Sequence, residues 1–358
     1  MVNISFVGDI MPGGMFCYGG GIGDEVLQIL HQGDLCIGTL ETAIGDGHKL
    51  CHLKNTPELG TIIYSPDETV QMLSDMHVNA VSLANNHSCD CDLEGLYHTM
   101  DLLDRYGIVH FGAGHNSEEA SRPGILHSNG KSICLLGYLK EYKYFYRGEG
   151  YVPSDNEGGL NIYNFKKAQS DIKKYKKQYD YVFVMPHWGT EGSAFPKFNE
   201  ADEAKKLIGA GADGVISSHA HIVQPIFQYK GKILAMNLGN FAFPDRYVRK
   251  PRITCYPSVN EIQNTEIPIV ESFKLVDRLT LKKVALPERR GCILRVAIDE
   301  HGLRHDVKYT LLNPTNIVEC RKKRSLDEII CSGYAGLLVK GKFGILYRVH
   351  SRIRSIFK

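Results

Sequence analysis

Residues 3–9, NISFVGD, form a short apolar run that ends on an acidic side chain, Asp9. Further runs of the same kind follow at residues 34–42, 79–87, 108–114, 132–139, 180–189 and 213–221. They are rich in β-branched and aromatic residues and apolar on both faces, which is typical of buried strands in a layered sheet. These runs therefore predict a fold built around buried, mainly parallel strands.

Amphipathic stretches lie between the runs and predict helices. Residues 66–76 begin with proline and two acids, and residues 92–107 carry an apolar stripe that ends at a glycine. Residues 164–179 and 199–211 predict two more helices. Strands that alternate with helices indicate an α/β fold.

After His221 the pattern changes to β-hairpins. We expect one hairpin around Lys230 and Gly231 and a second around His301 and Gly302, so that the later sheet is antiparallel. Residues 245–288 hold several prolines and no strong period, and we interpret them as a loop with short elements.

Composition narrows the class of protein. The chain has 358 residues, 43% of them hydrophobic, and a formal net charge of +2, which does not indicate a nucleic-acid partner. The ten cysteines are scattered without a Cys-x-x-Cys pair, which favours reduced thiols and a cytoplasmic location. We recognise no signal peptide and no apolar run of the roughly 18 residues that span a membrane.

Polar side chains of metal-ligand type stand where the predicted strands end. They are Asp9, Glu41, Asn86, His187, His219 and His221. Sites in open α/β sheets gather outside the carboxyl ends of strands, so these side chains could form one cluster. Carboxylate, amide and imidazole together suit Zn, Mn or Fe. His219 and His221 alternate along the predicted strand, so we expect both to lie on one face and to reach one centre.

Each of these residues also has a plain structural interpretation. An acid before glycine, such as Asp9, is often a turn former, and Asn86 could cap a helix. His187 beside Trp188 could be a packed aromatic pair. The order of all six along successive strand ends favours the metal site over these separate interpretations.

Taken in order, the motifs FVGD, LET, LANNHxxD, HWGxE, HxHxxQP and LGNF resemble the CapA family of capsule and poly-γ-glutamate synthesis proteins. This family lies within the calcineurin-like metallophosphoesterase superfamily, and the resemblance covers residues 2–315. It implies a four-layer α/β/β/α sandwich. It also implies that the six residues above are metal ligands and that Glu41 bridges two metals.

The resemblance implies further roles around these ligands. His87 matches the histidine that protonates or stabilises the leaving group, and Asp90 and Glu191 match family positions that could support catalysis. Asp90 could fix the tautomer of His87, or it could cap the helix that follows. Met11 stands where the superfamily has a third-position histidine. One metal then has Asp9, Glu41 and His221, and the other has Glu41, Asn86, His187 and His219.

These residues predict one or two divalent metal ions and a hydrolase or transferase. A divalent metal lowers the pKa of bound water from about 15.7 to about 7. The expected substrate is an anionic polymer or peptide with an amide or capsule-polymer linkage. A metal-dependent peptide epimerase and a polymer-binding or export accessory protein without catalysis remain as alternatives.

The C-terminal part differs in charge from the rest. From Cys320 onward the sequence holds ten lysines and arginines against two acids. We therefore predict a main domain at residues 1–318 and a basic tail at 319–358. The tail ends in a short amphipathic helix, which could contact the inner face of a membrane peripherally or dock on the domain.

Overall fold

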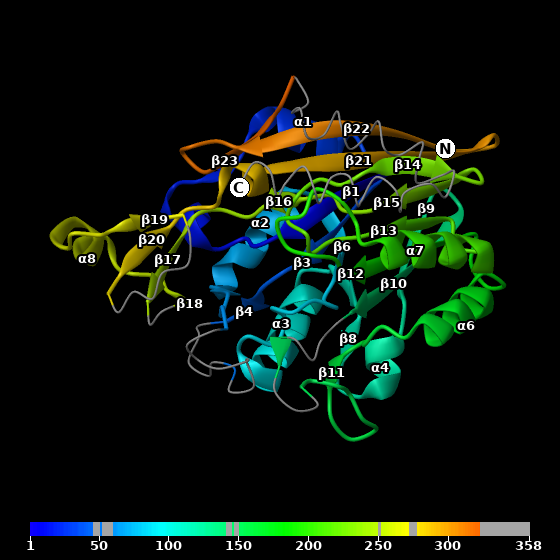
Figure 1. Cartoon of the computed structure of the whole chain (residues 1–358), viewed down its shortest axis with the longest axis horizontal. Helices are drawn as coiled ribbons and strands as arrows, with labels where there is room; N and C mark the ends of the chain where they lie inside the picture. Colours follow the sequence, from blue (N-terminus) through cyan, green and yellow to red (C-terminus); the bar gives the residue numbers. More distant parts are fainter. Residues whose placement is uncertain are drawn as a thin grey trace.

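The computed structural model describes residues 1–45, 51, 60–140, 145–146, 150–249, 252–271 and 278–322. Two large mixed sheets face each other, and helices cover the outer face of each (Figure 1). The arrangement is the predicted four-layer α/β/β/α sandwich.

The first sheet is centred on β1 (Val2–Ile10). On one side of β1 lie the parallel strands β3 (Leu35–Leu40), β6 (Val78–Ser82) and β7 (Val109–Phe111). On the other side lie β21 (Arg290–Asp299), β22 (Gly302–Leu312), β23 (Ile317–Cys320) and β2 (Gly21–Ile22). The short β16 (Asn240–Ala242) also pairs with β1, in parallel. Five parallel strands, β1, β3, β6, β7 and β16, thus end at one edge of this sheet.

The second sheet has the order β14 (Ile226–Tyr229), β15 (Lys232–Ala235), β13 (Gly214–Ile216), β12 (Tyr181–His187), β10 (Lys131–Leu139) and β9 (Gly124–Ser128). Its central strands β10, β12, β13 and β15 run parallel to one another. Alternate residues of these strands face opposite layers. Leu135 packs between the sheets, and its neighbour Leu136 packs under the helices.

Helices close the two outer faces. The first sheet is covered by α1 (Asp24–His31), α2 (Val70–Asp75) and α3 (Asp92–Arg105), and the second by α6 (Phe165–Tyr175) and α7 (Phe198–Ala210). Shorter elements connect them: η1 (Gly14–Tyr18), β4 (Ala43–Ile44), β5 (Tyr64–Ser65), η2 (Asp67–Thr69), β8 (Ala113–Gly114), α4 (Ser117–Ser121), β11 (Gly159–Leu160) and η3 (Leu286–Arg289). Between the sheets, the rings of Phe6 and Phe183 lie 5.0 Å apart.

Both predicted hairpins are present, but the prediction of one later antiparallel sheet is wrong. The β14–β15 hairpin turns at Lys230 and Gly231 and extends the second sheet. The β21–β22 hairpin instead joins the first sheet beside β1. A hairpin fixes only its own pairing, so the sequence could not show that the two hairpins belong to different layers.

The described residues between 245 and 288 contain the short elements that were predicted. They contain β17 (Arg246–Arg249), β18 (Ile253–Thr254), α8 (Val259–Asn264), β19 (Ile269–Val270) and β20 (Thr280–Lys282). The four strands form a separate small sheet that, with α8, makes a lobe on one side of the molecule (Figure 1). The strands are too short to give a clear period in the sequence.

Several predictions concern the end of the chain and the thiols. The last described strand, β23, crosses the predicted boundary at residue 318, and the predicted amphipathic helix lies outside the described residues. Every cysteine in the described part of the chain is a free thiol. Among the described residues, none of the helices combines the length and apolarity that crossing a bilayer requires.

Candidate metal centre

The six predicted ligands come together where the carboxyl ends of the two sheets meet. Asp9 lies near the end of β1, Glu41 directly follows β3, and Asn86 lies in the loop after β6. From the second sheet, His187 is the last residue of β12, and His219 and His221 follow β13. A bridge between His187 and Ser218 holds the two segments of the second sheet together.

Asp9 is held in place by an unusually close approach of two strands. The backbone N–H of Asp9 donates to the carbonyl of Gly239 at 3.1 Å. A Cβ atom at the preceding Gly8 would lie 1.8 Å from that same carbonyl oxygen. Only glycine therefore fits at residue 8, and its absence of a side chain lets β16 pack against β1 beside the carboxylate.

Three ligand-type atoms converge on Nε2 of His187. Oδ1 of Asn86 lies 2.8 Å away, Nδ1 of His219 3.1 Å away and Oε1 of Glu41 3.4 Å away. Atoms that bind one ion at about 2.1 Å stand roughly 3 to 3.5 Å from one another. We call Asn86, His187, His219 and Glu41 the His187 position.

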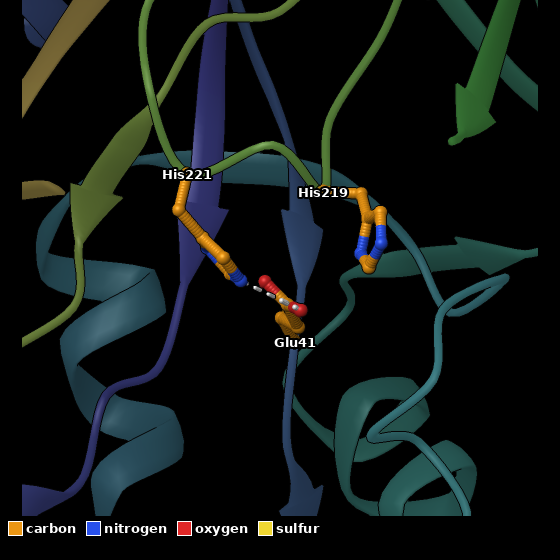
Figure 2. Close-up of side chains that lie close together, drawn as sticks. All are labelled: Glu41, His219 and His221. Carbon is orange, nitrogen blue, oxygen red and sulfur yellow. Dashed lines mark ion pairs between the residues drawn. The ribbon is translucent and has the colours of Figure 1, made fainter. Parts of the chain in front are cut away.

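A second group of ligands lies on the other side of Glu41. Nε2 of His221 is 3.7 Å from Oε1 of Glu41, and Nδ1 of His221 is 3.5 Å from Oδ2 of Asp9. Figure 2 shows Glu41 pointing up between the two histidines, with its ion pair to His221 dashed. Ligand atoms of Glu41, His219 and His221 all lie within 4.8 Å of one another. We call Asp9, His221 and Glu41 the His221 position.

His219 and His221 reach the centre in a way that the sequence did not predict. The strand β13 already ends at Ile216, so the two histidines do not alternate along a strand. Both have left-handed backbones, with φ of 97° at His219 and 56° at His221. Such a backbone costs a residue other than glycine about 1–3 kcal/mol and is concentrated at functional sites. The turn, and not a period of two, brings both imidazoles to Glu41.

Met11 supplies no ligand to the His221 position. It is fully buried and packs in a small apolar cluster with Ile63 and Phe243. Its backbone N–H donates to the carbonyl of Ala242 at 2.7 Å. The two positions are therefore unequal, since the His221 position has fewer protein ligands than the His187 position.

Protonation also differs between the two positions. Burial lowers the pKa of His187 to about 4, and burial together with His187 lowers the pKa of His219 well below its ordinary value. Burial alone would lower the pKa of His221, but Glu41 and Asp9 raise it to about 9. Burial and Glu41 raise the pKa of Asp9 to about 7. At neutral pH the His187 position thus offers free imidazole lone pairs, whereas His221 carries a proton.

The residues fit a cation. Oδ1 of Asp9 is buried and has no hydrogen-bond donor in the described part of the chain. Leaving a buried carboxylate oxygen uncompensated costs free energy, which a bound cation would offset. Nε2 of His187 can carry at most one proton, yet three ligand-type atoms surround it. A divalent metal would satisfy all of them at once.

His87 lies beside this centre with its ring held by Asp90. Nδ1 of His87 and Oδ2 of Asp90 are 2.6 Å apart, and the same oxygen accepts from the N–H of Ile63 at 2.6 Å. The helix α3 begins at Asp92 with Cys91 as its N-cap, so Asp90 faces His87 and does not cap that helix. Glu191 is exposed, and the structure does not bring it into the buried cluster.

Residues that orient the ligands were not predicted. Oγ of Ser218 lies 2.8 Å from Nδ1 of His187, and Oδ1 of Asn240 lies 2.8 Å from Nδ1 of His221. The hydroxyl of Tyr146 donates to the carbonyl of Asn86 at 2.7 Å. Ligand histidines commonly bond a partner through their second nitrogen. Asn240 falls within the LGNF motif, which was the one available signal; Ser218 and Tyr146 carried none.

We expect metal binding at the His221 position to depend steeply on pH. His221 must release its proton before Nε2 can bind, and the pKa is about 9, so affinity for Zn²⁺ should fall about tenfold per unit from pH 9 to pH 7. The Zn²⁺ affinity of the His187 position should change far less, because His187 and His219 are neutral throughout this pH range. Competition with a chromophoric chelator measures both. His221→Gln should abolish the steep phase, and equal slopes at the two positions would contradict the assignment.

Comparison with known proteins gives one family and several distant relatives. Residues 3–245 match the family model described as bacterial capsule synthesis protein PGA_cap. The chain is 27% identical over 265 residues to the PGA biosynthesis protein CapA of Bacillus subtilis, covering 70% of this chain and 65% of that protein. It is 28% identical over 187 residues to the capsule biosynthesis protein CapA of Bacillus anthracis, covering 51% of this chain and 44% of that protein. The chain thus spans less than two thirds of the length of either relative.

Among solved structures, the chain is similar to a 5'-nucleotidase from Candida albicans, with a TM-score of 0.41 and 11% identity. That similarity covers 95% of this chain and 58% of the other.

Proposed function

The chain belongs to the family of bacterial capsule synthesis proteins PGA_cap, and from this membership together with the candidate metal centre we propose a metal-dependent hydrolase or transferase. Its substrate is an amide linkage in an anionic polymer of the poly-γ-glutamate kind. The relatives are named for PGA and capsule biosynthesis, and we extend that role to the chemistry of this chain.

One observation carries the proposal. Side chains from three other strand ends deliver their ligand atoms to within 3.4 Å of Nε2 of His187. A vestigial site would not be expected to retain strained backbones at both His219 and His221, since strain persists only where the surrounding structure enforces it.

The residues have separate tasks in this proposal. Asn86, His187, His219 and Glu41 would hold one ion, and Asp9, His221 and Glu41 would hold a second. Zn, Mn or Fe fits these nitrogen and oxygen donors. A bound ion of this kind lowers the pKa of water and polarises a carbonyl oxygen.

His87 is the proposed proton donor to the leaving nitrogen. Its Nδ1 contacts Asp90 at 2.6 Å, so we assign the proton transfer to Nε2. Asp90 is itself fixed by the N–H of Ile63, so the ring of His87 is held in one orientation. A histidine oriented in this way is suited to general acid catalysis.

Charge around the centre supports an anionic substrate. Arg246 is buried, and although burial lowers its pKa, Glu288 and Glu41 act to raise it, which places the guanidinium within electrostatic range of the metal ligands. Lys197 acts electrostatically on His219. Both cations would favour a carboxylate-bearing polymer, whereas Glu191 and Glu288 act on His221 in the opposite sense.

Elemental analysis and one incubation test the proposal. Protein purified without chelator should contain one or two equivalents of a divalent metal. Incubated with poly-γ-glutamate in D₂O, it should produce new amino termini, or transfer the glutamyl group to an added amine. Deuterium at Cα without cleavage would replace the hydrolase by an epimerase. Protein that holds no metal and leaves the polymer unchanged would overturn the proposal in favour of an accessory role.

A further inference from the structure

We propose that Asn240 sets the tautomer of His221 and so makes Nε2 the metal-binding nitrogen at the His221 position. The inference rests on the metal centre of the proposed function and concerns a residue to which the family motifs gave no role. Asn240 is a positioning residue here, because it acts on the ion only through His221.

The orientation of the Asn240 amide is fixed by the backbone. One end of the amide lies 3.0 Å from the carbonyl oxygen of Glu288, and the other lies 2.8 Å from Nδ1 of His221. A carbonyl oxygen can only accept, so the end that faces Glu288 must be the NH₂ group. The end that faces His221 is therefore the oxygen Oδ1.

The amide oxygen in turn dictates where the imidazole carries its proton. An oxygen acceptor at 2.8 Å requires a proton on Nδ1 of His221. In the neutral ring Nε2 then holds the lone pair, and Nε2 is the nitrogen that lies 3.7 Å from the shared ligand Glu41. A chain of contacts thus runs from the Glu288 carbonyl through Asn240 to the ligand nitrogen.

The fold holds Asn240 rigidly in this place. It is 5% exposed and lies opposite Asp9 in the parallel pairing of β16 with β1, so one ladder positions a ligand and the residue that orients another ligand. A Cβ atom at Gly291 would lie 2.0 Å from the Asn240 carbonyl oxygen, which shows how closely β21 packs behind it. The orientation of the ligand imidazole matters more at the His221 position than at the His187 position, because Met11 supplies no ligand and the His221 position has fewer ligands.

His187 provides an internal comparison. Its Nδ1 faces the hydroxyl of Ser218 at 2.8 Å, and a hydroxyl can either donate or accept, so Ser218 does not impose a tautomer. Three ligand atoms already surround Nε2 of His187. Loss of Ser218 should therefore lower the metal affinity of the His187 position less than loss of Asn240 lowers that of the His221 position.

Two substitutions at residue 240 separate orientation of His221 from simple packing. Asn240→Ala removes both contacts, whereas Asn240→Asp keeps an oxygen for Nδ1 but cannot donate to Glu288. We expect Asn240→Ala to weaken Zn²⁺ binding at the His221 position about 10–100-fold, as loss of such a partner typically does, and Asn240→Asp to retain it. Binding at the His187 position should stay unchanged in both. Ser218→Ala is the matched control and should leave the His221 position unaffected.

Nitrogen NMR of the imidazoles gives a readout that packing alone would not move. In the Zn²⁺-loaded protein, Nδ1 of His221 should carry the proton and Nε2 should show the shift of a metal-bound nitrogen, with His221→Gln giving the assignment. Retention of both equivalents with wild-type affinity in Asn240→Ala, or equal damage in Asn240→Asp, would overturn the inference.

Failure of the proposed function is distinguishable from failure of this inference. If the wild-type protein binds no metal, the proposed metal enzyme is wrong. The metal-free spectrum, recorded at a pH high enough for the imidazole of His221 to be neutral, then still decides the role of Asn240. A downfield, hydrogen-bonded Nδ1 proton of His221 that disappears in Asn240→Ala supports it, and an unchanged spectrum refutes it.

Discussion

Replacing His187 with alanine should remove the metal from the His187 position and abolish activity on the polymer. Nε2 of His187 is the atom on which Asn86, His219 and Glu41 converge, so its loss leaves these ligands without their central partner. The effect on affinity should exceed the 10–100-fold loss that follows removal of a residue that merely orients a ligand. Elemental analysis should show one equivalent fewer than in the wild-type protein.

Thermal unfolding gives an independent measure of the same change. A metal that binds only the folded state stabilises that state by about 4 kcal/mol when its free concentration is about a thousand times its Kd. Added Zn²⁺ should therefore raise the Tm of the wild-type protein and raise that of His187→Ala much less. His110→Ala is a suitable control, because His110 lies on β7 of the same sandwich and pairs with Asp104. If His187→Ala bound metal stoichiometrically, the ligand assignment would be wrong.

The layered core was predictable because its strands are buried on both faces. Runs such as residues 132–139 are apolar throughout, since Leu135 faces the opposing sheet and Leu136 faces the helices. The order of strands in each sheet was not predictable. The pairing of β16 with β1 joins residues far apart in the chain, and nothing local in residues 240–242 specifies β1 as its partner.

The sequence was sufficient to predict which residues form the candidate site and that they lie at strand ends. All six predicted ligands gather, because carboxyl ends of parallel strands share one edge and the two sheets place their edges together. The backbone that delivers His219 and His221 was not predictable, since a left-handed φ at histidine arises from the surrounding packing and not from local preference. Glu191, a motif position with a predicted catalytic role, is exposed but acts electrostatically on His187 and His221, so its role stays a prediction.

The partners of the ligands show the limit of sequence reasoning most clearly. Asn240 and Ser218 are ordinary polar residues, and their role depends on which imidazole nitrogen lies 2.8 Å away. That distance depends on the tertiary arrangement of β16 and β13 around β1 and β12. The smaller number of ligands at the His221 position was nevertheless predicted, because Met11 stands where the resembled superfamily has a histidine.

Replacing His87 with glutamine should lower the rate of polymer cleavage about 10²–10⁴-fold, the usual contribution of a general acid, while metal content stays at the wild-type level. The metal should remain because the ligand is Asn86, whose side chain bonds His187 and whose carbonyl is held by Tyr146. Steady-state rates with matched elemental analysis measure the two effects on the same sample. Asp90→Asn should give a smaller loss, since it weakens the contact that orients His87 without removing the imidazole.

Substrates with different leaving groups distinguish proton donation by His87 from a general disturbance of the site. A leaving group that departs without protonation, such as an activated aryl group, gains little from a general acid. The His87→Gln variant should therefore be nearly as active as the wild-type protein on such a substrate and strongly impaired on the polymer. An equal loss on both substrates would show that His87 supports the metal centre structurally, and the leaving nitrogen would then need another proton source. The 2.6 Å contact between His87 and Asp90 favours the first outcome, because it holds the imidazole in one orientation beside the metal ligands.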